Sequence, residues 1–123
     1  MKFEIMPYDL TVCKVAEMGD IPSDIGFFFM ARTDEEISLV CKTEDVPKNV
    51  LCREDDWRAF RIKGVLDFSL TGILAQISGV LAKRDISIFA VSTYNTDYIL
   101  VRSFDLEKAV KVLKAEGYKT DMI

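Results

Sequence analysis

The chain has 123 residues and a formal net charge of −4; half of its residues are apolar and 29% are charged. Such a chain can build one compact domain, or two very small units that share a core, and it lacks the low hydrophobicity of disordered segments. Its acidic balance, without a basic stripe, argues against a surface for nucleic acid. Histidine is absent, so the commonest general base and zinc ligand are missing, and we expect neither a metal nor a cofactor.

The cysteines, the start of the chain and the lengths of its apolar runs indicate the cellular compartment in which we expect the protein. Cys13, Cys41 and Cys52 show no CxxC spacing, which indicates neither a disulfide framework nor a zinc knuckle. We expect inert, buried thiols in a reducing cytosol. The chain starts without the apolar run of a signal peptide, and no stretch reaches the roughly 18 apolar residues of a membrane span. These features predict a cytoplasmic protein that does not contact a membrane.

The first half of the chain is expected to form strands with little helix. Alternating or strongly apolar runs predict strands over Leu10–Ala16, Phe27–Ala31 and Ile37–Lys42. The connection over residues 17–26 contains glycines and a proline, and it is too short and too broken for a full helix. Residues 47–53 could hold a short helix. The acidic run 54–56 is expected to be a solvated linker, and the apolar triplet 27–29 to lie in the core or an interface.

The second half alternates between strand and helix signals. The period of the apolar residues predicts strands over Trp57–Lys63, Ile86–Thr93, Tyr98–Ser103 and Tyr118–Ile123. Helical spacing predicts one helix from about Leu70 to Arg84 and another from Leu106 to Leu113. We expect Ser69 and Asp105 to cap these helices and Gly117 to follow the second one. Gly79 lies inside the first helix, and close packing on a sheet is one reason to tolerate it.

The predicted fold class is α+β. The order of elements over residues 57–122 is β-α-β-β-α-β, the ferredoxin-like arrangement in which four antiparallel strands carry both helices on one face. The first half follows the same order with its first helix replaced by a loop. We therefore expect two ferredoxin-like units in tandem, a degenerate one over residues 1–56 and a complete one over residues 57–123. This repeat is inferred from element order, because no internal sequence identity is apparent.

The junction from Asp67 to Ile73 is the candidate binding site. A helix N-terminus offers free N–H groups and a partial positive charge. Gly72 has no Cβ, so a ligand can approach the backbone closely. A carboxylate group would fit such a place, although Ser69 could serve only as a helix cap.

Two segments resemble the ACT domain family. The run from Ser69 to Ala82 resembles the first helix of an ACT domain, but Ser69 and Thr71 stand where the family's Asp-x-Pro-Gly-like motif has its acid and its proline. The turn Ser-Thr-Tyr-Asn-Thr-Asp over residues 92–97 is similar to that of the ACT subfamily related to eukaryotic cytosolic arginine sensors, and to aspartate kinase regulatory regions. The resemblance covers residues 57–122 and is weak over residues 1–56.

The resemblance implies a non-catalytic regulatory protein. ACT domains bind small effectors, usually amino acids, at interfaces between ACT units, and they pair through their sheets or helices. The implied ligand contacts are Asp67, Phe68, Ser69, Leu70, Thr71, Gly72 and Ile73, with Thr93, Tyr94, Asn95, Thr96 and Asp97. The implied partners are an amino-acid-like ligand, a second copy of the chain in a homodimer, and a regulated protein.

The resemblance implies that different residues bind the carboxylate and the ammonium group of a zwitterionic ligand. Backbone N–H groups from Thr71 to Ile73 would bind its carboxylate, and Asp97 or Asp67 its ammonium group. Thr93 and Asn95 would add neutral hydrogen bonds. In arginine-binding relatives an acidic residue precedes the loop's Ser/Thr-Gly pair; here Leu70 holds that place, which weakens the case for a cationic ligand.

Other interpretations stay open. Asn95 and Asp97 could serve only to shape the hairpin turn, and Phe68 and Tyr94 could be packing residues. The protein could be a ligand-free ACT module that acts through protein contacts. A small acylphosphatase-like enzyme would need an arginine in residues 64–71, which have none. RNA binding would need aromatic platforms and a basic surface, so we expect neither enzymatic activity nor nucleic-acid binding.

Overall fold

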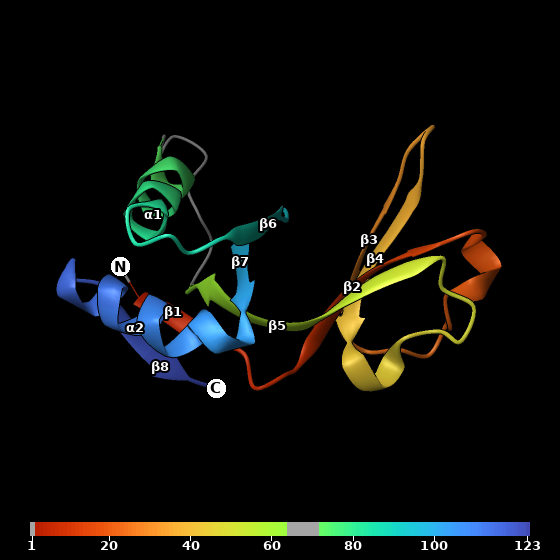
Figure 1. Ribbon diagram of the computed structural model, residues 1–123, viewed down its shortest axis with the longest axis horizontal. Helices are drawn as coiled ribbons and strands as arrows, with labels where there is room; N and C mark the ends of the chain where they lie inside the picture. Colours follow the sequence, from red (N-terminus) through yellow and green to blue (C-terminus); the bar gives the residue numbers. More distant parts are fainter. Residues whose placement is uncertain (1, 64–71) are drawn as a thin grey trace. The chain divides into compact units, whose positions relative to one another are not determined.

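The computed structural model describes residues 2–63 and 72–123 (Figure 1). Contacts between Cα atoms divide the chain into two compact units. We call Tyr8–Trp57 the N-terminal unit, and Met1–Pro7 together with Arg58–Ile123 the C-terminal unit. The expected ranges, 1–56 and 57–123, did not anticipate that the first residues of the chain pack in the C-terminal unit. Of the helices that the structure describes, none has the length and apolar character needed to cross a membrane.

The C-terminal unit has the predicted order β-α-β-β-α-β, preceded by one further strand. Its elements are β1 (Lys2–Ile5), the last part of β5 (Cys52–Ile62), α1 (Ile73–Ala82), β6 (Ile88–Ser92), β7 (Asp97–Arg102), η3 (Ser103–Asp105), α2 (Leu106–Ala115) and β8 (Lys119–Met122). The strands follow the order β6–β7–β5–β1–β8. Strand β1 was not predicted; it pairs antiparallel with β5 and parallel with β8.

One hydrophobic core joins the sheet of the C-terminal unit to both of its helices. The buried residues of this core are Phe3, Ile5, Phe60, Ile62, Ile77, Leu81, Ile86, Ile99, Val101, Ala109 and Leu113. The rings of Phe3 and Phe60 lie 5.3 Å apart in an edge-to-face contact, a favoured geometry for aromatic pairs. Burial of Phe3 and Ile5 explains why the short strand β1 is retained in the sheet.

The two ends of α2 differ in how well the sequence predicted them. After α2, the N–H groups of Gly117 and Tyr118 donate to the carbonyl oxygens of Lys114 and Leu113. This is a Schellman motif with Gly117 at φ +92°, so the prediction for Gly117 is confirmed. Asp105 occupies the N-cap position of α2, but its side chain makes no capping hydrogen bond, so its expected capping role is wrong.

Helix α1 is shorter than predicted. It begins at Ile73, with Gly72 as its N-cap residue, and it ends at Ala82, so Arg84 lies beyond the last turn. Gly79 is exposed, and a Cβ atom built there would meet nothing within 4 Å. The idea that Gly79 serves close packing on a sheet is therefore wrong.

The N-terminal unit is built from strands and short 3-10 helices. Its elements are β2 (Leu10–Val15), η1 (Met18–Asp20), β3 (Phe28–Arg32), β4 (Ile37–Lys42), η2 (Thr43–Asp45) and the first part of β5. They form the strand order β3–β4–β2–β5. Only η1 lies between β2 and β3, which confirms that no full helix forms there. The short helix expected over residues 47–53 is wrong, because β5 already begins at Cys52.

The acidic run 54–56 is part of strand β5 and not a linker. Here β5 pairs with β2, and the register shifts between Leu10 and Val12. The hydroxyl group of the buried Thr11 donates to Asp55 at 2.7 Å, and the guanidinium group of Arg53 donates to the same carboxylate. Asp56 adopts φ +68° at this irregularity, a conformation that Asp tolerates better than most residues.

The structure gives the residue-by-residue register of the internal repeat, which the sequence analysis inferred from element order alone. Three pairs of elements begin and end at residue numbers that differ by 60. The pairs are β3 with β6, β4 with β7, and η2 with η3. In both copies a threonine, Thr33 or Thr93, begins the hairpin turn and bonds to the residue three positions later. The two hairpins are therefore equivalent, residue by residue.

The core of the N-terminal unit is small. Cys13, Leu39 and Cys41 are buried under partly buried residues of the connecting segments, namely Ile21, Ile25, Val46 and Val50. Phe28 and Met30 pair with Cys41 and Leu39 in the sheet, yet they are 42% and 40% exposed. A connection without a full helix covers less of this face, so Phe28 lies outside this core. The other expectation for the triplet 27–29, that it lies in an interface, stays a prediction. Cys52 is exposed, contrary to the buried thiol expected.

Candidate functional site

The turn between β6 and β7 is closed by its own first and last residues. The N–H group and the hydroxyl group of Thr93 both donate to the carbonyl oxygen of Thr96, at 2.8 and 2.9 Å. The N–H group of Thr96 donates back to the Thr93 hydroxyl oxygen at 3.3 Å. Such side-chain bonds to nearby backbone are typical of Ser and Thr in turns. The Thr93 hydroxyl is thus engaged within the turn.

The same turn is attached to the end of strand β5. The hydroxyl group of Thr96 is buried and donates to the carbonyl oxygen of Ile62 at 2.9 Å. Ile62 is the last residue of β5, the strand that precedes α1 in the chain. This bond fixes the turn beside the end of the strand that leads to the candidate loop.

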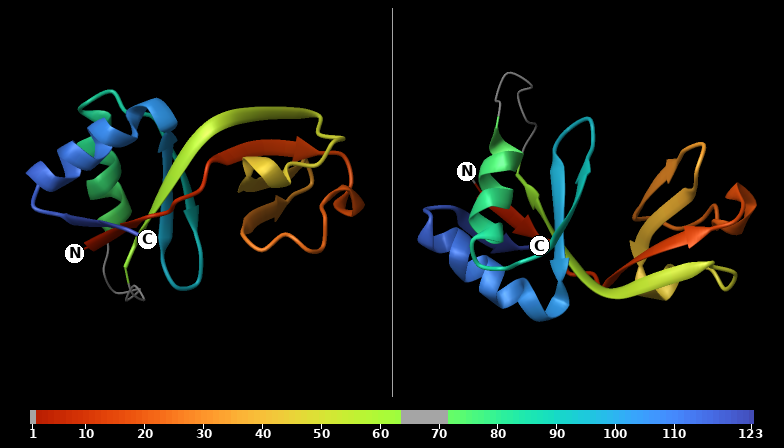
Figure 2. Two further views of the ribbon diagram at one scale, coloured as in Figure 1. Left: turned by 90° about the horizontal axis from the view of Figure 1, so that it is seen from below. Right: turned by 45° about the horizontal axis from the view of Figure 1, so that its top comes forward.

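The first turn of α1 contains backbone N–H groups that donate to no carbonyl oxygen of the helix itself. The first intrahelical bond runs from the N–H group of Gln76 to the carbonyl oxygen of Gly72, at 2.8 Å. The N–H groups of the preceding helical residues, starting with Ile73, therefore have no partner inside the helix. Gly72 is exposed at φ +80°, and a Cβ atom built on it would meet no described atom within 4 Å. Both views of Figure 2 show this end of α1 and the β6–β7 turn at the same end of the C-terminal unit.

The structure describes part of the predicted site. Gly72, Ile73 and the residues Thr93 to Asp97 are described, whereas Asp67, Phe68, Ser69, Leu70 and Thr71 lie outside the described residues. Tyr94 is 83% exposed, Asn95 is exposed, and Asp97 is half-buried. Thr96 has a structural role, because its hydroxyl group donates a hydrogen bond to the carbonyl oxygen of Ile62.

A polar group on β5 was missed by the sequence analysis. The guanidinium group of Arg61 donates to Glu4 at 3.1 Å and to the hydroxyl oxygen of Tyr98 at 3.3 Å. The Tyr98 hydroxyl, and then the Glu4 carboxylate, raise the pKa of Arg61. Side chains alternate along β5, so Arg61 lies on the other face of the strand from the buried Phe60 and Ile62. The partners of Arg61, Glu4 on β1 and Tyr98 on β7, are brought to it only by the fold.

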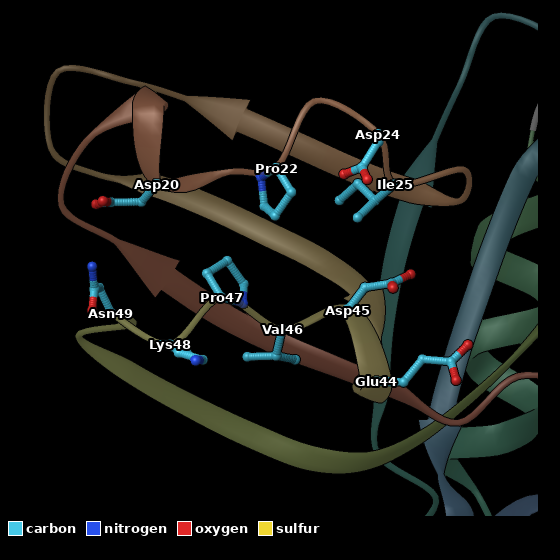
Figure 3. A pocket seen from close by; sticks show the side chains of 10 residues that line it. All are labelled: Asp20, Pro22, Asp24, Ile25, Glu44, Asp45, Val46, Pro47, Lys48 and Asn49. Atoms are coloured by element: carbon cyan, nitrogen blue, oxygen red, sulfur yellow. The ribbon is translucent and has the colours of Figure 1, made fainter.

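A cavity in the N-terminal unit was also not predicted. It has a volume of about 370 Å³, and Figure 3 shows the side chains that line it. The lining residues are Asp20, Pro22, Asp24, Ile25, Glu44, Asp45, Val46, Pro47, Lys48 and Asn49. Among the residues that the structure describes, no group of three acidic, cysteine or histidine side chains could hold a metal ion.

The chain is similar to known proteins in sequence and in fold. The ACT domain family model matches residues 53–115. The "Cytosolic arginine sensor for mTORC1 subunit 1" of Homo sapiens is 37% identical over 108 residues, which cover 82% of this chain and 33% of that protein. The chain thus spans about a third of the length of the curated relatives that it matches.

Solved structures give the same fold. Protein Atu0741 from Agrobacterium tumefaciens has a TM-score of 0.87 and 32% identity, covering 99% of this chain and 92% of that chain. The ligand-free regulatory subunit of aspartate kinase from Thermus thermophilus has a TM-score of 0.67 and 8% identity, covering 94% and 96%. At that identity the second likeness concerns the fold alone.

Proposed function

Because the chain belongs to the ACT domain family, we propose that it is a non-catalytic regulatory protein that binds a small amino-acid-like molecule. The supporting observation is the bond from Thr96 to Ile62, which holds the β6–β7 turn at the end of β5. The Gly72 end of α1 lies at the same end of the unit (Figure 2). A relative that is 37% identical is named an arginine sensor.

The proposed chemistry divides the ligand into its two charged ends. The N–H groups of Gly72 and Ile73 bind the carboxylate, because an exposed helix N-terminus attracts anions and Gly72 offers no side chain in the way. The carboxylate of Asp97 takes the ammonium group, and Asn95 adds a neutral hydrogen bond. Asp67 and the rest of the loop up to Thr71 belong to the proposed site as well.

The proposed output is a shift between arrangements of ACT units. A ligand that binds one arrangement better than another moves the equilibrium by that difference in affinity. We propose that the protein acts in the cytoplasm as a homodimer and passes the signal to a regulated protein partner. Sheet edges such as β3 and β6 leave backbone groups available for such contacts.

The proposal is tested by a thermal-shift screen of the common amino acids, followed by calorimetric titration of any that stabilises the protein. A ligand present at about 100 times its Kd adds about 2.7 kcal/mol to the free energy of unfolding. We expect the variants Gly72→Ala and Asp97→Asn to weaken binding of that amino acid. A screen in which no amino acid raises the unfolding temperature would contradict the proposal.

Two control variants separate binding from folding. Gly117→Ala changes another glycine of positive φ, at the end of α2 and outside the site. Asp105→Asn removes a carboxylate that makes no capping hydrogen bond. Both controls should bind the amino acid as the wild type does, so equal weakening in the controls would also count against the site.

A ligand-free interaction module is the second candidate. It is favoured by the turn itself, since the hydroxyl groups of Thr93 and Thr96 are both used within the protein, while Tyr94 is 83% exposed. In this case no amino acid stabilises the protein, and a Tyr94→Ala variant loses a protein partner without losing stability.

A further inference from the structure

The two units carry opposite charge. Residues 8–57 contain 12 acidic and 5 basic residues, a formal net charge of −7, whereas the rest of the chain contains 8 acidic and 11 basic residues, a net charge of +3. An asymmetry of this size attracts a partner of complementary charge and speeds its association.

Four of the acidic residues of the N-terminal unit line the cavity described above, together with one lysine, Lys48. Two segments that face each other across the cavity supply carboxylates, Asp24 from the stretch before β3 and Glu44 from η2 (Figure 3). The same cavity has apolar lining groups, namely Pro22, Ile25, Val46 and Pro47. An apolar lining with an acidic rim suits an aromatic side chain that is flanked by basic residues.

The C-terminal unit carries such a group on α2 and the turn before it. A second hollow, of about 440 Å³, is lined by Arg84, Phe104, Glu107, Lys108, Lys111 and Val112. Phe104 is 78% exposed, so its ring can be buried by a partner surface. The ammonium group of Lys108 bonds to the carbonyl oxygen of Arg84, so two basic residues lie together beside this ring.

These two surfaces occupy equivalent places in the internal repeat. Glu44 and Phe104 are the middle residues of η2 and η3, whose numbers differ by 60. The same position of the fold therefore presents a carboxylate beside a cavity in one unit and an exposed aromatic ring beside basic residues in the other.

We propose that Phe104 and its basic neighbours in one copy of the chain dock in the acidic cavity of the N-terminal unit of a second copy. The ring enters the apolar part, while Lys108 and Lys111 face the carboxylates of the rim. Each such contact joins the C-terminal unit of one copy to the N-terminal unit of another copy. This inference rests on the self-association proposed above and not on ligand binding.

The experiment is sedimentation equilibrium of the full chain, up to about 300 µM, at about 50 and 500 mM salt. We expect the wild type to self-associate, and less strongly at high salt, because the contacting charges are screened. Phe104→Ala should weaken self-association at least about tenfold, because aromatic anchors dominate interfaces. The double variants K108E/K111E and D24K/E44K should each weaken it as much.

A mixture supplies the decisive result. Each variant alone brings like charges together. When K108E/K111E and D24K/E44K are combined, the intact basic surface of D24K/E44K meets the intact acidic cavity of K108E/K111E, and the acidic surface of K108E/K111E meets the lysines of the D24K/E44K cavity. Opposite charges then meet in contacts between the two variants, so the mixture should associate more strongly than either variant alone. A mixture no stronger than its components would overturn the inference.

Control variants carry the same charge changes outside the two surfaces. Lys114→Glu with Lys119→Glu, and Asp34→Lys with Glu35→Lys, change exposed residues that line neither hollow. The controls should self-associate as the wild type does, and circular dichroism verifies the fold of every variant. If the wild type and Phe104→Ala self-associate equally, the inferred contact is contradicted, while the proposed self-association is kept. If the wild type is monomeric, both the inferred contact and the proposed self-association are contradicted. The amino-acid screen is unaffected by either result.

Discussion

The hydroxyl group of Thr96 donates a hydrogen bond to the carbonyl oxygen of Ile62 at 2.9 Å and is buried from solvent. It joins two segments that are 34 residues apart in the chain. The corresponding position of the N-terminal unit is Glu36, which is exposed at the end of its own turn. The bond therefore distinguishes the complete unit from the reduced one, and it positions the turn of the candidate site.

Replacing Thr96 by Val should destabilise the protein by about 1–3 kcal/mol, because a buried carbonyl oxygen loses its donor. Thr96→Ser keeps the hydroxyl group and should retain most of the stability. Urea unfolding followed by circular dichroism measures the difference. The exposed Glu36→Ala provides the control, with an expected change below about 0.5 kcal/mol. A Thr96→Val variant as stable as Glu36→Ala would show that the bond contributes nothing.

Much of the C-terminal unit could be predicted from its sequence. Helix α2 and strands β6 and β7 carry strong periodic signals, and Gly117 marks the end of α2 in the way that an αL position requires. Strand β1 escaped notice because it is short, and because its partners β5 and β8 are brought to it only by long-range pairing. Local patterns carry no information about such pairing.

The candidate site was predictable only in outline. The start of α1 was identified from the free N–H groups of a helix N-terminus and from Gly72, and the turn from a resemblance, but the bond from Thr96 to Ile62 depends on the register of distant strands. The repeat was inferred from element order, but its residue-by-residue register was missed, because few identical residues, such as Thr33 and Thr93, mark it. The equivalence lies in backbone positions. The acidic run around Asp55 resembled a linker because its partner Thr11 is far away in the chain.

Two glycines should respond to alanine in opposite directions. Gly79 is exposed inside α1, and a Cβ atom there meets nothing, so Gly79→Ala should stabilise the protein by up to about 1 kcal/mol. Gly117 has φ +92°, so Gly117→Ala should destabilise it by about 1 kcal/mol or more. Thermal unfolding of both variants under one buffer condition tests the pair. A destabilising Gly79→Ala would indicate that this face of α1 is covered in solution.

The stability of the protein should fall at acidic pH partly because of Asp55. The hydroxyl of Thr11, and then the guanidinium group of Arg53, lower the pKa of the Asp55 carboxyl below its ordinary value. A carboxyl whose pKa is lower in the folded state contributes stability above its ordinary pKa, and this contribution is lost as the pH falls through the lowered value. Asp55→Asn should therefore be less stable than the wild type near neutral pH, and the difference should shrink below about pH 4.

Unfolding temperatures measured at intervals from about pH 2 to pH 7 test this dependence. The neighbouring exposed Glu54→Gln makes the same change of charge on the same strand and serves as the control. A difference between Asp55→Asn and the wild type that stays constant over the whole range would contradict the assignment.

The three cysteines should react with a thiol reagent in two classes. Cys52 is exposed, whereas Cys13 and Cys41 are buried together in the core of the N-terminal unit. The hydrogen bond with Cys13, together with burial, raises the pKa of the Cys41 thiol far above its ordinary value, so its reactive thiolate is scarce. We expect one thiol per chain to react promptly in the native protein and the other two at least about a hundredfold more slowly, at the rate at which this unit opens. Cys52→Ser should abolish the fast phase alone; a fast phase that survives this change would mean that the Cys13 and Cys41 strands open readily in solution.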